Sequence, residues 1–167
     1  MNASQKCLIT DFDETFFNTS VSRGIRKTKN RDWNDVYALI PQFEMYEGWE
    51  ELLAWLRNHN VKLAVVSAAK TELLKRTFAH FGIVPDAIVG FQWCYRKPHG
   101  KLIQMALDKL GMEASQAISI GNSLKDEIQA QKAGVKFVGA CWDSLDKETL
   151  KLHGDTVDHP MELTKFL

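Results

Sequence analysis

Two acidic residues and a hydroxyl follow a short apolar segment near the start of the 167-residue chain. Asp11, Asp13 and Thr15 come directly after Cys7-Leu8-Ile9-Thr10, a run that is typical of a buried parallel strand. Parallel sheets present their functional groups at the carboxyl ends of the strands. Two carboxylates this close repel each other, so we expect a cation, a shared proton or a phosphate-binding cradle beside them. The alternative is an acidic turn, or an aspartate that caps a helix.

Further polar side chains follow other apolar runs of the sequence. Ser67 ends one run, Lys97 precedes a helical pattern, and Asn122 and Asp126 follow another run. Taken singly, Ser67 could cap the next helix, Lys97 could be an exposed lysine, and Asp126 could be a first-turn acid favoured by the helix dipole. A parallel sheet would bring all of them to one edge, and this convergence favours a functional site.

Alternating strands and helices account for most of the chain. Apolar and β-branched runs predict strands over residues 7–11, 61–67, 88–91, 117–121, 135–140 and, at an edge, 156–157. Helical spacing predicts helices over residues 49–58, 71–81, 100–110, 123–133, 145–152 and 160–167. Such alternation implies right-handed crossovers and a doubly wound parallel sheet covered on both faces, so we predict one α/β domain over residues 1–167.

Residues 16–47 interrupt this alternation. A structureless loop of that length is uncommon in a compact domain, so we expect a small inserted element with a helix around residues 33–40 that ends at Pro41. The insert contains a basic cluster and then several aromatic residues: Arg23, Arg26, Lys27, Lys29 and Arg31, followed by Trp33, Tyr37, Phe43 and Tyr46. The basic cluster is either a solvated surface or a patch that receives an anionic substrate.

The composition excludes several classes of partner. The 21 basic and 21 acidic residues balance, which disfavours a nucleic acid or an anionic membrane as partner. The three cysteines, Cys7, Cys94 and Cys141, have no metal-binding spacing and indicate a reducing compartment. The first six residues lack the apolar stretch of a signal peptide, and no run reaches transmembrane length. We therefore expect a cytoplasmic domain.

The ordered set of polar residues resembles the haloacid dehalogenase-like (HAD) superfamily of phosphohydrolases. Its DxDxT, strand-end Ser/Thr, Lys and Gly-Asp-xxx-Asp motifs correspond to Asp11/Asp13/Thr15, Ser67, Lys97 and Gly121–Asp126. The resemblance covers residues 7–15 and about 46–140. Residues 46–53, 96–100, 130–134 and, more loosely, 154–163 are similar to the phosphoglycolate-phosphatase-like branch. The resemblance implies a Rossmann-like core with a small cap at about residues 16–47.

The resemblance also implies a role for each site residue. Asp11 would be the nucleophile that forms an aspartyl-phosphate, and Asp13 would be the general acid and base. Lys97 would neutralise charge on the transferring group. The implied substrate-binding residues are Thr15, Ser67, Ala68 and Lys97. The implied cofactor is Mg²⁺, held by Asp11, the main-chain carbonyl of Asp13, Asn122 and Asp126.

Two positions depart from the family pattern. Asn122 stands where the first acidic residue of its motif is usual, which predicts weaker Mg²⁺ binding and leaves open a non-catalytic phosphate-binding or interaction protein. Glu14 stands where glycine is commoner, and the resulting DxDET string resembles the phosphatases that act on the polymerase tail, which hints at a protein substrate. Asp13 favours phosphate over halide chemistry, because a halide leaving group needs no acid.

The size of the insert bears on the substrate. The resemblance implies that larger caps select small substrates, so a short insert leaves the cleft open. A large substrate, such as a phosphoprotein or a nucleic-acid end, could complete such a cleft, and a phosphorylated small molecule is the other expected substrate. A second copy of the chain could also complete the cleft.

Overall fold

A six-stranded sheet forms the centre of the computed structural model, which describes residues 5–95 and 97–167. Predictions that involve residues 1–4 or Arg96 lie outside the described residues. The strand order is β5-β4-β1-β6-β7-β8, and every neighbouring pair is parallel. The strands are β1 (Cys7–Thr10), β4 (Lys62–Val66), β5 (Ala87–Val89), β6 (Ala117–Gly121), β7 (Lys136–Ala140) and β8 (Thr156–Val157). The predicted parallel α/β sheet is confirmed.

The strand order places a topological switch at the carboxyl ends of β1 and β6. From β1 the chain moves to β4 and β5 on one side, and it then returns to β6, β7 and β8 on the other. The connections therefore leave β1 and β6 in opposite directions, which opens a crevice above their carboxyl ends. Asp11 follows β1 directly, so the sheet delivers it to this crevice.

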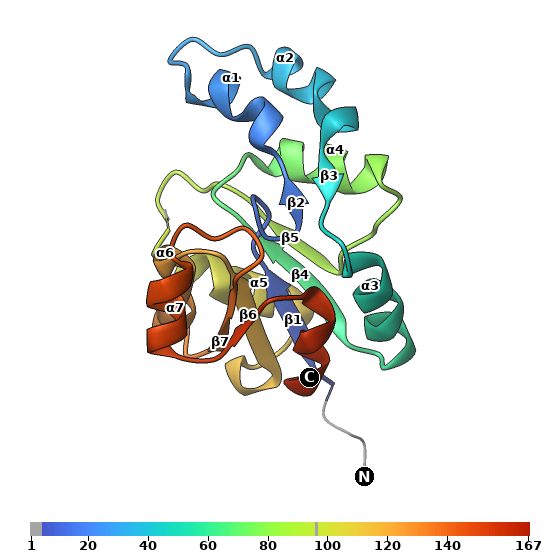
Figure 1. Cartoon of the computed structure of the whole chain (residues 1–167), viewed down its shortest axis with the longest axis vertical. Coiled ribbons are helices and arrows are strands. Elements are labelled where there is room, and N and C mark those ends of the chain that lie inside the picture. The colour runs from blue at the N-terminus through green and yellow to red at the C-terminus, as the bar shows by residue number, and fades with distance from the viewer. Residues whose placement is uncertain (1–4, 96) are drawn as a thin grey trace.

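Helices cover both faces of the sheet (Figure 1). One face packs on α3 (Trp49–Asn58), α4 (Thr71–His80) and the 3-10 segment η4 (Pro160–Lys165). The other packs on α5 (Lys101–Leu110) and α6 (Leu124–Lys132). Residues of β1 alternate between the two cores, since Leu8 belongs to the first and Cys7 and Ile9 to the second. A further helix, α7 (Lys147–His153), connects β7 to β8.

The insert folds into a small unit at one end of the sheet. It contains β2 (Phe17–Asn18), η1 (Ser20–Ser22), α1 (Arg23–Lys27), α2 (Trp33–Ala38), η2 (Ile40–Gln42) and β3 (Glu44–Met45), and β2 pairs antiparallel with β3. Figure 1 shows α1 and α2, in blue and cyan, beyond the sheet at the end opposite the C-terminus. Lys70 lies 4.8 Å above the Trp33 ring and Arg76 lies 4.4 Å above the Tyr37 ring, so the insert packs on α4.

Several elements differ from the sequence predictions. The helix expected around residues 33–40 is α2, which ends at Ala38, and Pro41 lies in the following 3-10 turn. The closing helix predicted over residues 160–167 is present as a 3-10 helix, Pro160–Lys165, which has Pro160 in its first turn and ends two residues earlier. Helix α1 and strands β2 and β3 were not predicted, because elements of five and two residues carry too little apolar periodicity to detect. No helix within the described part of the chain is long and apolar enough to span a membrane.

Candidate active site

The loop after β1 places Asp11 and Asp13 on one side and aromatic side chains on the other. The Asp11 amide donates to the Ile120 carbonyl at 3.0 Å, which holds the loop above β1 and β6. Phe12 and Phe16 are fully buried, and the Phe16 ring stacks on Trp49 with centroids 4.0 Å apart. These aromatic contacts anchor the loop in the core and leave the two carboxylates facing a cavity.

Thr15 lies on the buried side of this loop. Its carbonyl accepts hydrogen bonds from the indole nitrogens of Trp49 at 2.9 Å and Trp142 at 3.0 Å. Its side chain is fully buried, and its hydroxyl has no hydrogen-bond partner within the described residues. Thr15 therefore lies in the core and does not line the cavity described below, so its substrate-binding role stays a prediction. The chain turns at Glu14, where φ is 54°, so the direction of the next side chain could not be inferred from residue spacing.

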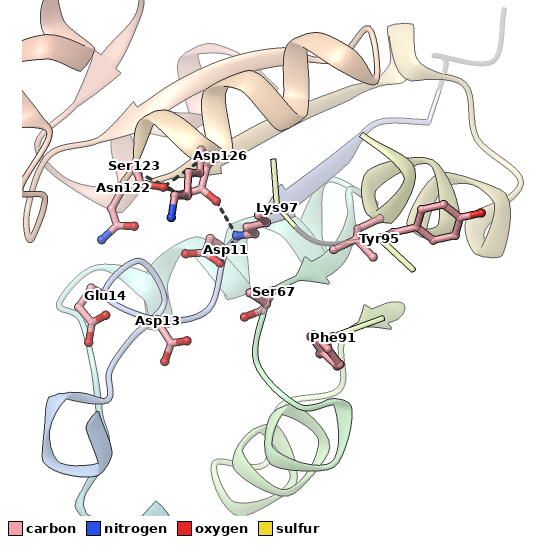
Figure 2. A pocket seen from close by; sticks show the side chains of 13 residues that line it. Asp11, Asp13, Glu14, Ser67, Phe91, Tyr95, Lys97, Asn122, Ser123 and Asp126 are labelled. Carbon is pink, nitrogen blue, oxygen red and sulfur yellow. Dashed lines mark hydrogen bonds and ion pairs between the residues drawn. The ribbon is translucent and has the colours of Figure 1, made fainter. Parts of the chain in front are cut away.

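One ammonium group bridges two carboxylates at the carboxyl edge of the sheet. Lys97 Nζ lies 2.6 Å from Asp11 Oδ1 and 2.5 Å from Asp126 Oδ1. Figure 2 shows these three side chains pointing toward one another. Burial and the facing Asp126 carboxylate raise the pKa of Asp11 to about 7, although Lys97 opposes the shift. Burial alone would lower the pKa of Lys97, but the two carboxylates outweigh it and raise that pKa.

Two local features fix Asp126 in this cluster. Ser123 and Asp126 form a capping box at the start of α6, in which each side chain accepts from the main-chain amide of the other, and Ser123 Oγ also donates to Asp126 Oδ2 at 2.6 Å. Gly121 passes so close that an added Cβ would lie 2.4–2.6 Å from the Asp126 side chain. Only glycine fits there, because any larger residue would displace the carboxylate. The helix-capping role of Asp126 and its contact with Lys97 therefore coexist.

A cavity of about 420 Å³ opens beside this cluster. It is lined by seven of the eight predicted site residues, namely Asp11, Asp13, Ser67, Ala68, Lys97, Asn122 and Asp126, while Thr15 is absent. The sequence interpretation missed six further lining residues, which are Glu14, Phe91, Tyr95, Leu102, Ser123 and Lys125. Ser67 directly follows β4, and its hydroxyl accepts from the Ala69 amide at 3.0 Å. Ser67 does not cap the next helix, because the N-cap residue of α4 is Lys70, so this hydrogen bond stabilises only the turn between β4 and α4.

Asn122 is held by the loop that follows β7. Its Nδ2 donates to the Asp143 carbonyl at 3.2 Å, and its own main-chain carbonyl accepts from Ser144 Oγ at 2.5 Å. With the amide nitrogen engaged, the side-chain oxygen is the atom left to act as an acceptor or ligand. The substitution that departs from the family pattern therefore keeps a hard oxygen in the cavity but removes one negative charge.

Residues of the insert surround the second carboxylate, Asp13. Arg26 binds it with both ends of its guanidinium, from Nη1 to Oδ1 at 2.6 Å and from Nη2 to Oδ2 at 2.8 Å. The Thr19 hydroxyl donates to Oδ1 at 2.5 Å. Burial alone would raise the pKa of Asp13, but the bonds from Arg26 and Thr19 outweigh it and lower that pKa.

The basic cluster of the insert divides between the site and the surface. Arg26 binds Asp13, and Arg23 forms an ion pair with Glu14 at 3.0 Å. Lys27 lines an adjoining cavity together with both arginines. Lys29 is exposed, and Arg31 lies 5.4 Å from the Trp33 ring centroid. Lys29 therefore belongs to a solvated surface, whereas Arg23 and Arg26 lie at the cavity, and a role of these two in receiving an anionic substrate stays a prediction.

The donor atoms at the edge of the sheet are the kind that magnesium prefers. Within the described residues, no group of three or more His, Cys, Asp or Glu side chains is arranged to hold a metal ion. An ion would therefore need other ligands besides Asp11 and Asp126, and the Asn122 side-chain oxygen and the Asp13 carbonyl are available. All four are hard oxygen donors, which fits Mg²⁺ and does not fit a soft metal.

The chain belongs to the haloacid dehalogenase-like hydrolase family, whose model matches residues 4–140. It is 29% identical to a pyrophosphatase, PpaX, of Bacillus pumilus over 65% of this chain and 51% of that protein. It is 32% identical to a phosphoglycolate phosphatase of Pectobacterium atrosepticum over 62% of this chain and 45% of that protein. The chain thus spans about half the length of these curated relatives.

The fold has close counterparts among solved structures. One is a mutant of CbbY from Rhodobacter sphaeroides in complex with xylulose-(1,5)bisphosphate. Its TM-score is 0.75 at 16% sequence identity, over 95% of this chain and 96% of that chain. At this identity the likeness shows the fold alone.

Proposed function

We propose that this chain is a Mg²⁺-dependent phosphomonoester hydrolase that acts through an aspartyl-phosphate. The observation that carries the proposal is the contact of Lys97 with both Asp11 and Asp126 at the wall of a cavity that Asp13 also lines. A carboxylate held beside an ammonium group can approach a phosphate whose oxygens the same ammonium neutralises. Asp13 lies two residues further along the same loop, where it can exchange a proton with the leaving oxygen.

The reaction divides into two displacements at phosphorus. In the first, an Asp11 oxygen forms a bond to phosphorus and the ester P–O bond breaks, while Asp13, which takes up a proton from solvent when it leaves Arg26, gives that proton to the leaving oxygen. In the second, a water oxygen attacks phosphorus, Asp13 takes the proton of that water, and the bond from phosphorus to Asp11 breaks. Inorganic phosphate leaves and both aspartates return to their starting states.

Charge at the reacting centre must be balanced in both steps. Lys97 and the Ser67 hydroxyl face the cavity and would bind the phosphoryl oxygens. Mg²⁺ would be held by Asp11, the Asp13 carbonyl, Asn122 and Asp126, and it would supply further positive charge for the phosphate. The Asp11 carboxylate and an incoming phosphate repel each other. The single positive charge of Lys97 does not neutralise both anions, so a second cation would be needed.

The insert at residues 16–47 would act as a small cap over this site. The names of two relatives, a pyrophosphatase and a phosphoglycolate phosphatase, and the bisphosphate bound to the structural neighbour support a phosphorylated small molecule as substrate. A phosphoprotein or nucleic-acid end is the larger alternative that a short cap would admit.

Turnover of a generic aryl phosphate with and without Mg²⁺ tests this function. We expect hydrolysis that stops in EDTA and returns with Mg²⁺, and a loss of at least about 10³-fold in Asp11→Asn, because an amide cannot attack phosphorus. Asp108→Asn, an exposed change on α5, is the matched control and should keep full activity. Phosphate binding without any turnover by the unmodified chain would instead support a binding protein.

A further inference from the structure

Arg26 donates hydrogen bonds to both carboxyl oxygens of Asp13, the group that would protonate the leaving oxygen in the proposed reaction. Asp13 Oδ1 and Oδ2 each accept from a different nitrogen of Arg26, at 2.6 and 2.8 Å. A general acid must lie within about 2.6–3.2 Å of the leaving oxygen. Asp13 cannot reach that oxygen while both of its own oxygens face the guanidinium. One of these contacts must therefore break before the leaving group is protonated.

Releasing Asp13 leaves a charged group without its partner. The Arg26 side chain is only 19% exposed, so water cannot replace the carboxylate well. Removing one member of a largely buried ion pair is costly, because the remaining charge stays desolvated. An anion that takes the place of Asp13 on Arg26 would remove this cost. The fork of a guanidinium suits the two oxygens of a carboxylate or phosphate.

A second cavity lies where such an anion would sit. Its volume is about 540 Å³, and it shares Asp13, Glu14 and Asn122 with the first cavity. Arg23, Arg26 and Lys27 contribute its positive charge. Arg23 already pairs with Glu14, whereas Lys27 has no carboxylate partner within the described residues. The cavity therefore offers two cations to an incoming anion, once Asp13 has turned away.

The position of Asp13 also fixes the direction of the leaving group. Figure 2 shows Asp13 and Glu14 on one side of the first cavity, and Phe91 and Tyr95 on the other. A leaving oxygen that meets Asp13 lies on the Glu14 side, which the second cavity adjoins. The rest of the leaving group therefore extends toward Arg26 and away from the aromatic wall.

We propose that Arg26 selects phosphomonoesters whose leaving group carries a second anionic group, and that this group displaces Asp13 from the guanidinium. The proposal rests on the phosphatase function above. Because Arg26 and the leaving oxygen would contact the same carboxyl group, the second anion must lie only a few bonds from the scissile oxygen. Substrates with a neutral leaving group would leave Arg26 bound to Asp13 and would react slowly.

Two substrates that differ in one group test this selection. Phosphoglycolate carries a carboxylate on its leaving group, and the phosphate ester of glycolamide carries a neutral carboxamide of the same shape. We expect the unmodified chain to hydrolyse the carboxylate with a kcat/KM about 10- to 100-fold higher, the size expected of one charge-assisted contact. This comparison needs no variant, so it remains decisive even if a substitution at Arg26 prevents folding.

Arg26→Gln then tests the residue itself. We expect its kcat/KM for phosphoglycolate to fall about 10- to 100-fold, and its value for the carboxamide to stay the same or rise, because Asp13 is released. Lys29→Gln removes an equal charge from the same segment outside both cavities and should change neither value. Arg26→Lys keeps the charge without the fork and should retain an intermediate preference.

The outcomes separate this inference from the function on which it rests. Equal kcat/KM values for the two substrates in the unmodified chain, or an equal loss of both in Arg26→Gln, would overturn the role of Arg26 and leave the phosphatase intact. Absence of turnover with either substrate and with aryl phosphates would overturn the proposed function, and the selection by Arg26 with it.

Discussion

Asp11 and Asp13 lie two residues apart on one loop, yet different parts of the molecule control them. Asp11 contacts Lys97 and faces Asp126, which both belong to loops and helices of the core. Asp13 contacts Thr19 and Arg26, which both belong to the insert. One cation serves two carboxylates in the core cluster, whereas Arg26 and Asp13 pair one to one. Burial and the facing Asp126 carboxylate therefore raise the pKa of Asp11, whereas at Asp13 the bonds from Arg26 outweigh burial and lower the pKa.

This difference separates two tasks within one small domain. The core cluster is built on strand ends and on a capped helix, which position groups precisely enough for attack on phosphorus. Through Arg26, the insert reaches the group that would protonate the leaving oxygen. Chemistry would therefore depend on the core, and the choice of substrate on the insert.

The largest effect should come from removing the shared cation of the core cluster. Lys97→Met leaves the Asp11 and Asp126 carboxylates facing each other in a buried place. We expect a loss of about 3–5 kcal/mol in the free energy of unfolding and of about 10²- to 10³-fold in kcat. Urea denaturation and steady-state kinetics measure the two effects. Lys101→Met, an exposed change on α5, should alter neither, and equal behaviour of the two variants would show that Lys97 does not hold the cluster.

The opposite pKa shifts predict opposite pH dependences of stability. The pKa of Asp11 rises from 3.8 to about 7 on folding, so its stabilising contribution is complete below the lower value and is lost as the pH rises through the higher one. In EDTA, the free energy of unfolding of Asp11→Asn relative to the unmodified chain should therefore increase between about pH 4 and 7, by at most about 1.4 kcal/mol per pH unit.

Asp13→Asn provides the comparison for this measurement. The pKa of Asp13 is lowered, so its stabilising contribution is present above its ordinary value and is lost only in more acidic solution. The free energy of unfolding of Asp13→Asn relative to the unmodified chain should stay constant between about pH 4 and 7, the interval in which that of Asp11→Asn increases. Parallel curves for Asp11→Asn and the unmodified chain over this interval would contradict the raised pKa of Asp11.

A smaller effect should follow from restoring the missing acid of the core cluster. Asn122→Asp replaces an amide oxygen with an anionic one, so the Mg²⁺ concentration that gives the half-maximal rate should fall about tenfold. The variant is assayed by Mg²⁺ titration beside Asn58→Asp, which adds the same charge at the exposed end of α3. A requirement that is unchanged in Asn122→Asp, or equally lowered in both variants, would place Asn122 outside the ligands of the ion.

Most of the core cluster could be predicted from the sequence, because strand ends are easy to locate. Apolar runs identify β1, β4 and β6 within a residue or two, and parallel strands bring the residues after them to one edge. This reasoning brings Asp11, Ser67 and Asp126 together without knowledge of side-chain directions. It fails for Thr15, since the turn at Glu14 directs that hydroxyl into the core.

The insert could not be predicted in the same way. Helix α1 has five residues and no apolar periodicity, so the sequence contains no sign that Arg26 faces Asp13. That contact depends on how thirteen residues of chain fold back, through a two-residue strand and a 3-10 turn. The basic cluster itself is visible in the sequence, and two of its members, Arg23 and Arg26, pair with acidic residues of the loop after β1.

The central claim, that Asp11 attacks phosphorus while Asp13 serves the leaving group, is tested most directly by Asp13→Asn and a nitrophenyl phosphate whose leaving group needs no proton. The first displacement should still occur, and the second should be slow, because no base activates water. We predict a burst of one nitrophenolate per chain and a phosphoryl group on the peptide that contains Asp11, detected by mass spectrometry after an acid quench. A variant without a burst, or a phosphoryl group on any other residue, would contradict the account.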